Sequence, residues 1–547
     1  MAEKMKTAHE DTFVLDSLPP VDEWPEMDFS GVPELSYPEK LNCGVELLDR
    51  MVERGHGSRP VLHFNGRIWT YKDLKTKADQ VARVLAEDMN LKPGNRVLLR
   101  SPNNPMMVAC WFGIVKAGGV VVATMPLLRA KELSYIIDKA DILHGLCDVA
   151  LSEEFEESRS QVSRLEHFRY FSNDGERNKD LEQAMAGKPA GFENVQTFSS
   201  DPVLIAFTSG TTGAAKGTIH FHRDVLAICD TFARYVNVVS PEDIYLGSPP
   251  LAFTFGLGAL VTFPMRFGAS TVMVEQFGPT TMLETIQEYG VTGLYTAPTA
   301  YRAMTGLVAE YDLSSLKSCV SAGEHIPLPT WQDWKDATGI KIIDGIGATE
   351  MLHIFISASG DEIRPGATGK AIPGYQARIV DENGDEIPIG EEGWLAVKGP
   401  TGCRYLDNPE RQEKYVRKGW NITGDIFSQD EDGYFWYVAR GDDMIISSGY
   451  NISGPEVETS LLAHPKVAEC AVVGFPDEER GHIVKAYVVV RNPVDKTDAV
   501  IRELQDFVKA DIAPYKYPRA IAFLDELPKT QTGKLQRFRL REQASPS

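Results

Sequence analysis

The sequence has few cysteines, and none of them is placed for a zinc site or a disulfide framework. The seven cysteines lie at positions 43, 110, 147, 229, 319, 403 and 470, and no two form a CxxC pair. An odd number of isolated thiols is typical of a reducing compartment. We therefore expect a cytoplasmic protein with free thiols.

An excess of positive charge is also missing. The chain has 56 Lys and Arg against 77 Asp and Glu, which gives a formal net charge of −21. Nucleic acids and anionic membrane surfaces attract basic proteins, so this balance argues against both as partners. An anionic ligand would need local positive charge.

A secretory or membrane-spanning segment is lacking as well. The first residues, MAEKMKTAHEDTF, contain no apolar run, so we expect no signal peptide. The uncharged stretch 244–265 is long enough to cross a bilayer. It contains three prolines and several glycines, however, and these residues break helices. We interpret it as buried core that lines a pocket.

The pattern of helix-like and strand-like segments predicts an α/β protein. A chain of 547 residues, 43% of them apolar, is too long for one compact domain. Residues 61–200 and 203–360 alternate the two kinds of segment, which predicts parallel sheets covered by helices. The first 40 residues or so are acidic and proline-dotted, and we expect an extended arm there.

The pattern of predicted elements changes after residue 365. Asn383-Gly384 and Asp432-Gly433 each lie between strand-like runs, which is a hairpin signal and predicts a small β unit over 365–439. We expect this unit to belong to a large N-terminal domain over residues 1–439. A hinge at 440–443 and a small mobile α+β domain over 444–547 complete the predicted organisation.

The segment 208–217, Thr-Ser-Gly-Thr-Thr-Gly-Ala-Ala-Lys-Gly, holds the strongest functional signal. Its glycines allow close approach to a ligand, and its hydroxyls, N–H groups and lysine suit a polyphosphate. Strand-like runs flank it, and Ala215 precedes the lysine, so it differs from the common strand–loop–helix phosphate loop. The alternative is a flexible surface turn. The predicted phosphate-binding residues are Thr208, Ser209, Gly210, Thr211, Thr212, Gly213 and Lys216.

Further candidate residues follow other strand-like segments. The run 344–350 places carboxylates beside a hydroxyl, a group that can hold Mg²⁺ on a phosphate. The small residues in 321–324 would let a flat ring lie against the backbone. Asp425 could accept from both hydroxyls of a ribose, and Lys534 lies in a Gly/Thr turn. Each of these signals alone also fits an ordinary surface turn or a solvated lysine.

In order along the chain, these segments resemble the adenylate-forming superfamily of acyl-CoA synthetases, peptide-synthetase adenylation domains and luciferases. The resemblance covers residues 60–540 approximately and rests on the segments 208–217, 347–350, 393–395, 423–425, 440–443 and 528–534. It implies a large AMP-binding and acyl-binding domain and two half-reactions. A carboxylate attacks the α-phosphate of ATP to give an acyl-adenylate and pyrophosphate, and the CoA thiol then displaces AMP.

The resemblance also implies roles for individual residues. Lys534 would bridge carboxylate and phosphate, Glu350 would hold Mg²⁺, and Thr349 would act at the α-phosphate. The small domain would rotate about Asp442 and bring Gly449 to CoA. The other implied nucleotide-binding residues are Ala322, Gly323, Glu324, Asp344, Gly345, Ile346, Gly347, Asp425 and Arg440. The chain departs from the common pattern at Ala215, Ile346, Ile446 and Asn451, where proline, tyrosine, lysine and arginine are frequent.

The implied acyl pocket lies between residues 250–256 and 321–354. The run 344–355 is similar to that of benzoate-type CoA ligases, and the segment 249–258 resembles that of 2-aminobenzoate CoA ligases. The expected substrate-binding residues are Phe253, Thr254, Phe255, Gly256, His353 and Ile354. The aromatic rings and the glycine would form a short, flat slot in which an aromatic ring stacks. His353 would bind a ring substituent, or it is an ordinary core histidine.

We therefore expect an ATP-dependent aryl-CoA ligase that uses ATP, Mg²⁺ and coenzyme A and acts on 2-aminobenzoate or benzoate. The alternatives are a stand-alone adenylation enzyme that loads an aryl acid on a carrier protein, and a medium-chain acyl-CoA ligase. A nucleotide-binding regulator without catalysis is disfavoured by Lys534, Glu350 and Asp425, because a sensor needs only some of them. The sequence leaves a homodimer open.

Overall fold

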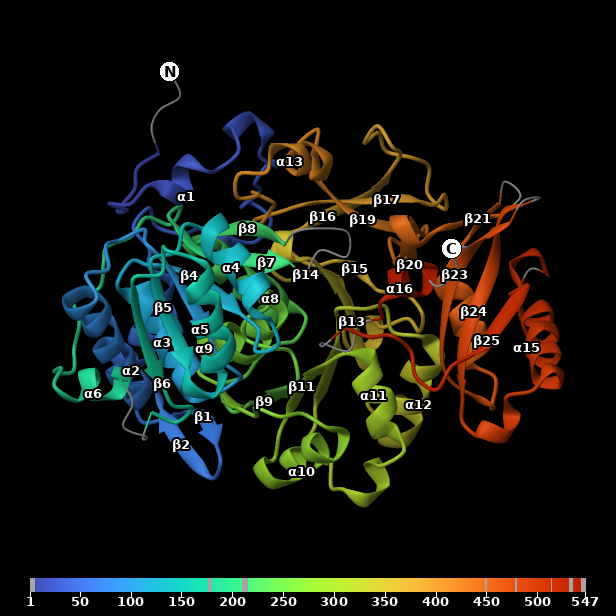
Figure 1. The fold of residues 1–547 in the computed structure, drawn as a ribbon, viewed down its shortest axis with the longest axis horizontal. Coiled ribbons are helices and arrows are strands. Elements are labelled where there is room, and N and C mark those ends of the chain that lie inside the picture. The colour runs from blue at the N-terminus through green and yellow to red at the C-terminus, as the bar shows by residue number, and fades with distance from the viewer. Residues whose placement is uncertain are drawn as a thin grey trace.

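The computed structural model describes residues 5–175, 180–208, 215–447, 450–477, 480–512, 514–530 and 535–542. It consists of a large assembly of helix-covered sheets and a smaller unit formed by the C-terminal residues, on the right in Figure 1. The predicted fold class, a large α/β domain with a small β unit followed by a small α+β domain, is confirmed.

The first sheet of the large domain has six strands. Its order is β6 (His167–Phe171), β5 (His144–Asp148), β3 (Arg96–Arg100), β4 (Val120–Thr124), β7 (Pro202–Thr208) and β8 (Lys216–Phe221). All neighbours are parallel except the last pair. Helices α4 (Ala130–Lys139) and α5 (Ser152–Gln161) cover one face, to which they contribute Ile136, Ile137 and Phe155.

The second sheet has nine strands and carries most of the predicted site. Its order is β15 (Lys370–Ala371), β14 (Ile354–Ser357), β13 (Ile342–Gly347), β12 (Ser318–Ser321), β11 (Gly293–Thr296), β9 (Ile244–Gly247), β10 (Ser270–Val272), β1 (Pro60–Phe64) and β2 (Arg67–Thr70). The strands from β13 to β1 are parallel. Helices α10 (Pro279–Tyr289), α11 (Pro298–Thr305) and α12 (Leu328–Thr338) cover the outer face.

The main hydrophobic core lies between these two sheets. Helix α2 (Tyr71–Arg83) starts at Thr70, whose hydroxyl accepts the Asp73 N–H while Asp73 caps Thr70 in return. The other helices of this layer are α3 (Pro105–Lys116), α7 (His222–Ile228), α8 (Thr254–Leu257) and α9 (Phe263–Phe267). The uncharged stretch 244–265 is therefore core. Within the described part of the chain, no helix is long and apolar enough to cross a membrane.

The β unit is a five-stranded antiparallel sheet. It contains β16 (Gln376–Val380), β17 (Gly393–Lys398), β18 (Val416–Arg417), β19 (Trp420–Gln429) and β20 (Phe435–Arg440), with α13 (Pro409–Tyr415) before β18. The turn between β19 and β20 contains Gly433 at φ 85°, a conformation that glycine adopts without strain. The start of the predicted range differs, because β15 joins the nine-stranded sheet.

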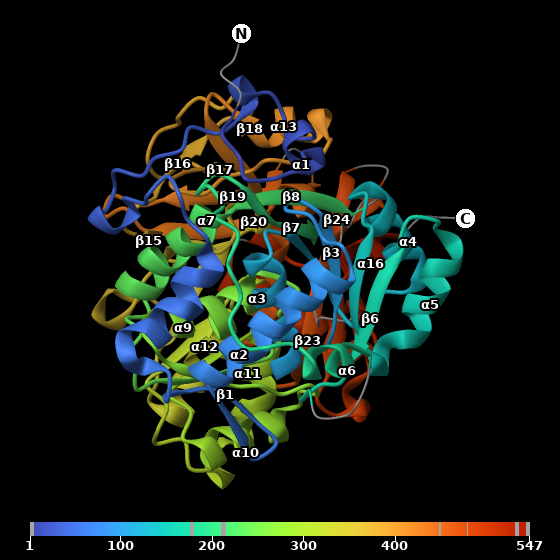
Figure 2. The same cartoon turned by 90° about the vertical axis from the view of Figure 1, so that its left-hand side faces the viewer.

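The acidic N-terminal segment packs along the large domain. Asp11 accepts from Arg96 Nη1 at 2.5 Å just before the short helix α1 (Phe13–Asp16). Trp24 lies against Phe221, with ring centroids 5.7 Å apart. The Glu26 N–H donates to the Gly419 carbonyl at 2.9 Å. Figure 2 shows this segment, in dark blue, running beside α13 and β18. It therefore joins the six-stranded sheet to the β unit.

The small domain has a core of its own. Strands β21 (Ile445–Ser447) and β22 (Tyr450–Ile452) form a hairpin, and β23 (Val467–Asp477), β24 (Gly481–Val490) and β25 (Ala520–Phe523) form a sheet. Its helices are α14 (Gly454–Leu462), α15 (Asp498–Asp511) and α16 (Arg537–Glu542). Val457 and Leu461 of α14, Leu504 of α15 and Val472 and Val488 of the sheet fill this core.

Candidate active site

The sequence motifs meet at one edge of the nine-stranded sheet. Because β9, β11, β12 and β13 are parallel, their carboxyl ends lie at the same edge, where α/β proteins bind ligands. The segment 250–256 follows β9, 322–324 follows β12, and the short 3₁₀ helix η10 (Thr349–Met351) follows β13. Ser321 is paired with Asp344, so the predicted segments on β12 and β13 lie side by side.

The predicted phosphate loop lies between two strands, as its flanks indicated. β7 and β8 are antiparallel, and Thr208 is paired with Lys216 at their open end. The predicted residues Ser209, Gly210, Thr211, Thr212 and Gly213 fall outside the described part of the chain. Helix α7 begins at His222, directly after β8, so His220 lies on the strand and His222 on the helix.

Lys216 is surrounded by charges from three distant segments. Partial burial lowers its pKa, the positive charges of Arg411 and Arg440 lower it further, and the carboxylate of Glu350 raises it. These interactions show that the start of β8 lies near α13, the end of β20 and η10. The acidic protein thus has the concentration of positive charge that a polyphosphate requires.

Glu350 and Thr349 are held by side chains that the sequence did not indicate. The Tyr405 hydroxyl donates to Glu350 Oε1 at 2.5 Å, and His220 Nε2 donates to the Thr349 carbonyl at 2.8 Å. Burial lowers the pKa of His220 to about 4, so its ring is neutral and carries its proton on Nε2. No pattern in residues 400–406 pointed to Tyr405.

The donor set around Glu350 fits the implied Mg²⁺. Carboxylate and hydroxyl oxygens are the ligands that this ion prefers. Tyr405 occupies Oε1, and Oε2 has no hydrogen-bond partner among the described residues. Glu350 would hold the ion, which would neutralise phosphate charge beside the Thr349 hydroxyl.

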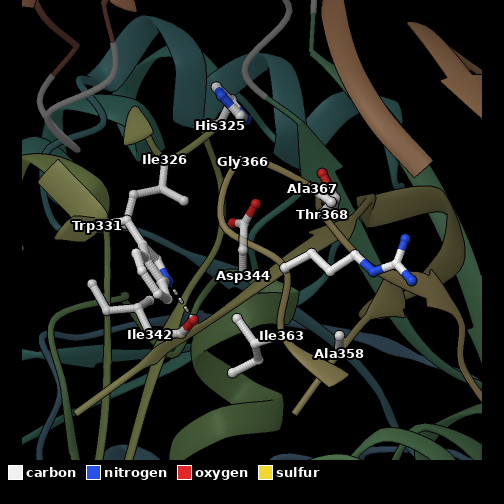
Figure 3. Close-up of a pocket in the computed structure, with 11 residues that line it drawn as sticks. His325, Ile326, Trp331, Ile342, Asp344, Ala358, Ile363, Gly366, Ala367 and Thr368 are labelled. Carbon is white, nitrogen blue, oxygen red and sulfur yellow. Dashed lines mark hydrogen bonds between the residues drawn. The ribbon is translucent and has the colours of Figure 1, made fainter. Parts of the chain in front are cut away.

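Asp344 lines a small pocket beside the nucleotide motifs. Figure 3 shows its carboxylate between the Trp331 ring and Ala367, with Ile342 and Ile363 below. Burial among these apolar groups raises the pKa of Asp344 to about 8, against a lowering by the Gly345 N–H. The carboxyl is therefore mostly protonated at neutral pH. Ile346 follows on the same strand, at the position where tyrosine is frequent.

Several glycines of these motifs are required by the packing. A Cβ on Gly347 would lie 2.7 Å from the His353 carbonyl oxygen, and one on Gly345 would lie 2.8 Å from the Ile354 side chain. Gly323 has φ 91°. Its neighbour Ala322 is buried. The backbone at this edge is thus close-packed.

Asp425 and Arg440 are brought together by the β19–β20 hairpin. They are paired across the two strands, and Arg440 Nη1 donates to Asp425 Oδ1 at 3.0 Å. The predicted hinge follows directly as η12 (Gly441–Asp443), which contains Asp442. Asp443 accepts from Arg541 Nη1 at 2.5 Å, so helix α16 contacts the hinge.

Lys534 and Gly449 fall outside the described part of the chain. Leu535, which follows Lys534, is described: it forms a bridge with Lys529, and its N–H donates to Glu324 Oε1 at 3.1 Å. The small domain therefore contacts the large domain at Glu324.

The expected acyl slot is divided between two places around helix α8. Phe253, Thr254 and Leu257 line a small apolar cavity together with Trp111 and Val121. Gly256 is required there, because its Cβ would lie 2.2 Å from the Pro250 carbonyl oxygen.

Phe255 belongs instead to an aromatic cluster around His353. The centroid of the His353 ring lies 4.5 Å from that of Phe263 and 5.5 Å from those of Phe255 and Phe232. His353 is 3% exposed, and neither ring nitrogen has a hydrogen bond of normal geometry among the described residues. Burial lowers its pKa to about 3, although the nearby Phe255 backbone raises it. Ile354 follows in β14 and is buried.

Comparison with known proteins identifies both parts of the chain. Residues 48–404 match the family described as AMP-binding enzyme, and residues 456–534 match the AMP-binding enzyme C-terminal domain. The chain is 34% identical to a benzoate–CoA ligase of Thauera aromatica, over 93% of this chain and 97% of that protein. It is also 34% identical to the mitochondrial acyl-coenzyme A synthetase ACSM3 of Pongo abelii, over 93% and 90%.

A solved structure resembles the whole architecture. The crystal structure of the anthranilate CoA ligase AuaEII in complex with anthranoyl-AMP superposes with a TM-score of 0.89 and 34% identity, over 94% of this chain and 99% of that chain.

Proposed function

Because this chain belongs to the AMP-binding enzyme family of CoA ligases and acyl-CoA synthetases, we propose that it is an aryl-CoA ligase for a benzoate-type acid. ATP and CoA are substrates of this family. The acid that we propose is 2-aminobenzoate or benzoate, which the enzyme activates as the acyl-adenylate and transfers to CoA with release of AMP and pyrophosphate.

In the first half-reaction two anions must approach one another. Lys216 and the loop that begins at Thr208 would orient the outer phosphates, beside Arg411 and Arg440. Lys534 would lie between the acid and the α-phosphate, since Leu535 docks at Glu324. Asp425, held by Arg440, would accept from the ribose hydroxyls. Glu350 would hold Mg²⁺, which supplies charge neutralisation at the phosphates, and Thr349 would act at the α-phosphate.

The second half-reaction requires the Lys534 turn to leave the site. Rotation about η12 would separate Leu535 from Glu324 and bring the β21–β22 hairpin, with Gly449, toward the adenylate. The thiol of CoA would then displace AMP. We propose Asp442 as the residue whose backbone turns in this step.

The main support for an aromatic substrate is the environment of the His353 side chain. A buried imidazole that lacks a hydrogen bond of normal geometry is costly, and among the described residues the His353 ring is in this state, surrounded by the rings of Phe255, Phe263 and Phe232. An aromatic acid with a polar ring substituent would satisfy a ring nitrogen and add its own apolar faces to the cluster. An amino group next to the carboxylate is such a substituent.

A medium-chain acid is the second candidate. The cavity beside Trp111 and Val121 has an almost entirely apolar lining, to which Thr254 contributes a side-chain hydroxyl, and an alkyl chain also fits such a lining. The similarity to acyl-coenzyme A synthetase ACSM3 is consistent with this candidate.

Release of AMP in the presence of ATP, Mg²⁺ and CoA decides between these candidates. The acids to be compared are benzoate, 2-aminobenzoate, salicylate and octanoate. We expect the highest kcat/KM for an aryl acid, whereas a preference for octanoate would overturn the proposal. Product formation with a carrier protein in place of CoA, and none with CoA, would favour the carrier-loading alternative.

His353→Leu tests the proposed contact with the ring substituent. Loss of one hydrogen bond of roughly 1 kcal/mol should lower kcat/KM for 2-aminobenzoate about fivefold more than for benzoate. An equal effect on both acids would show that His353 only fills space.

A further inference from the structure

Three fully buried side chains hold the turn that carries Thr349 and Glu350. His220 Nε2 donates to the Thr349 carbonyl at 2.8 Å, and the Tyr405 hydroxyl donates to Glu350 Oε1 at 2.5 Å. The Thr401 hydroxyl donates to the Met351 carbonyl at 2.8 Å. Each of the three donors is at most 1% exposed. Three consecutive residues of the turn are therefore fixed from outside.

The turn has little structure of its own to hold it in place. It is a single 3₁₀ turn whose two backbone bonds, Met351 N–H to Ala348 and Leu352 N–H to Thr349, are both 3.1 Å long. Leu352, which ends it, has φ 69°, a conformation that a leucine adopts only when its surroundings impose it. The external bonds reach the three residues that precede Leu352.

The donors belong to two segments that are joined to each other. Tyr405 forms a bridge with Thr218 of β8, and the Ile219 N–H donates to the Arg404 carbonyl at 2.8 Å. A buried ion pair between Arg404 and Asp224, at 2.8 Å, secures the same junction. Because β8 begins at Lys216, these contacts connect the strand that carries Lys216 to Glu350.

We propose that Tyr405 and His220 are positioning residues for adenylation. Tyr405 takes Oε1 of Glu350 and fixes the carboxylate in one rotamer, which leaves Oε2 for the cation. His220 fixes the backbone of Thr349 and thus the start of the same turn. This inference rests on the proposed function, in which Glu350 and Thr349 act on the ATP phosphates.

The test uses a matched pair of phenylalanine variants. Tyr405→Phe removes the hydroxyl that donates to Glu350. Tyr415→Phe removes a hydroxyl that is also buried, has no hydrogen-bond partner among the described residues, and belongs to a ring 5.9 Å from that of Tyr405. Loss of a bond to a charged group should lower the rate of ATP–pyrophosphate exchange at least about tenfold in Tyr405→Phe, and Tyr415→Phe should stay within about twofold of wild type.

Two further readouts separate positioning from general damage. Thioester formation from a supplied acyl-adenylate does not use the ATP phosphates, so Tyr405→Phe should carry it out at the wild-type rate. Calorimetric binding of ATP should weaken in the presence of Mg²⁺ and stay unchanged in the presence of EDTA. An equal loss of both half-reactions, or of ATP affinity in both buffers, would overturn the proposal.

A second pair of variants tests His220 independently. His220→Gln keeps an N–H donor of similar reach, and His220→Leu does not. The glutamine variant should recover most of the exchange rate that the leucine variant loses, and identical rates would overturn the role of His220; this pair also decides the matter if Tyr405→Phe does not fold. Wild-type protein that forms no acyl-adenylate from any acid would refute the proposed function instead. Active wild type together with fully active Tyr405→Phe would refute this inference alone.

Discussion

Asp344 allows a quantitative test of the pocket shown in Figure 3, because its pKa makes the stability of the protein depend on pH. Its pKa is about 8 in the folded chain against 3.8 without the fold, and burial is the main cause. A raised folded-state pKa of an acid means that the folded protein binds the proton more tightly. The stabilisation is fully present below pH 3.8 and is lost as the pH rises toward 8.

The magnitude follows from the two pKa values. Between pH 5 and pH 7 the unfolded chain has lost this proton and the folded chain keeps it, so each pH unit costs about 1.4 kcal/mol. The free energy of unfolding should therefore fall by up to about 2.7 kcal/mol over this window because of Asp344 alone. This is an upper bound, since Asp344 is not fully shielded from solvent.

Asp344→Asn removes the titration while it keeps the size of the side chain. Urea unfolding of both proteins without nucleotide, at pH 5, 6 and 7, gives the difference between them, and Trp331 beside Asp344 provides a fluorescence signal. Contributions of all other groups cancel in this difference. Wild type should lose stability relative to the variant as the pH rises. A difference that does not change with pH, or that changes in the opposite direction, would refute the assignment.

Three further substitutions test the assigned roles. Lys534→Ala should lower ATP–pyrophosphate exchange about a hundredfold, as the loss of one transition-state contact typically does, and should spare thioester formation from a supplied acyl-adenylate. Gly449→Leu should lower thioester formation in the same two assays and spare ATP–pyrophosphate exchange. Equal loss of both activities in either variant would contradict the role assigned to that residue. Gly258→Ala would place a Cβ 2.4 Å from His353 Cδ2. In steady-state kinetics the KM for the aryl acid should therefore rise while the KM for ATP stays the same. Unchanged values of both would contradict the placement of His353 at the acyl pocket.

Local sequence patterns indicate individual helices and strands. They do not indicate which strands lie next to each other in a sheet. The helix after Thr70 has a capping pair and an apolar stripe, and both act within one turn. By contrast, β1 lies beside β10, where Leu62 is paired with Thr271. That pairing depends on how helices pack between two sheets, and no local pattern contains this information.

The same distinction holds for the site. The contact between Asp425 and Arg440 was predictable, because the Asp432-Gly433 turn fixes the register of one hairpin. The contact between Tyr405 and Glu350 was not predictable. It forms only when residues 401–406 pack along β8, which lies nearly two hundred positions earlier in the sequence. His353 was open to two interpretations from the sequence because its partners are decided by the whole fold.

The charge distribution explains how an acidic chain can accommodate a triphosphate. Lys216, Arg411 and Arg440 come from three separate elements, and the two arginines lower the pKa of Lys216, which means that the three cations repel one another. The carboxylate of Glu350 offsets part of this repulsion, and it also accepts a hydrogen bond from the Tyr405 hydroxyl. A polyanion bound among the cations would turn the remaining repulsion into attraction, most strongly where water is excluded. The net charge of −21 therefore matters less for ATP than this local excess, which the fold assembles at the edge of the sheet where the motifs meet.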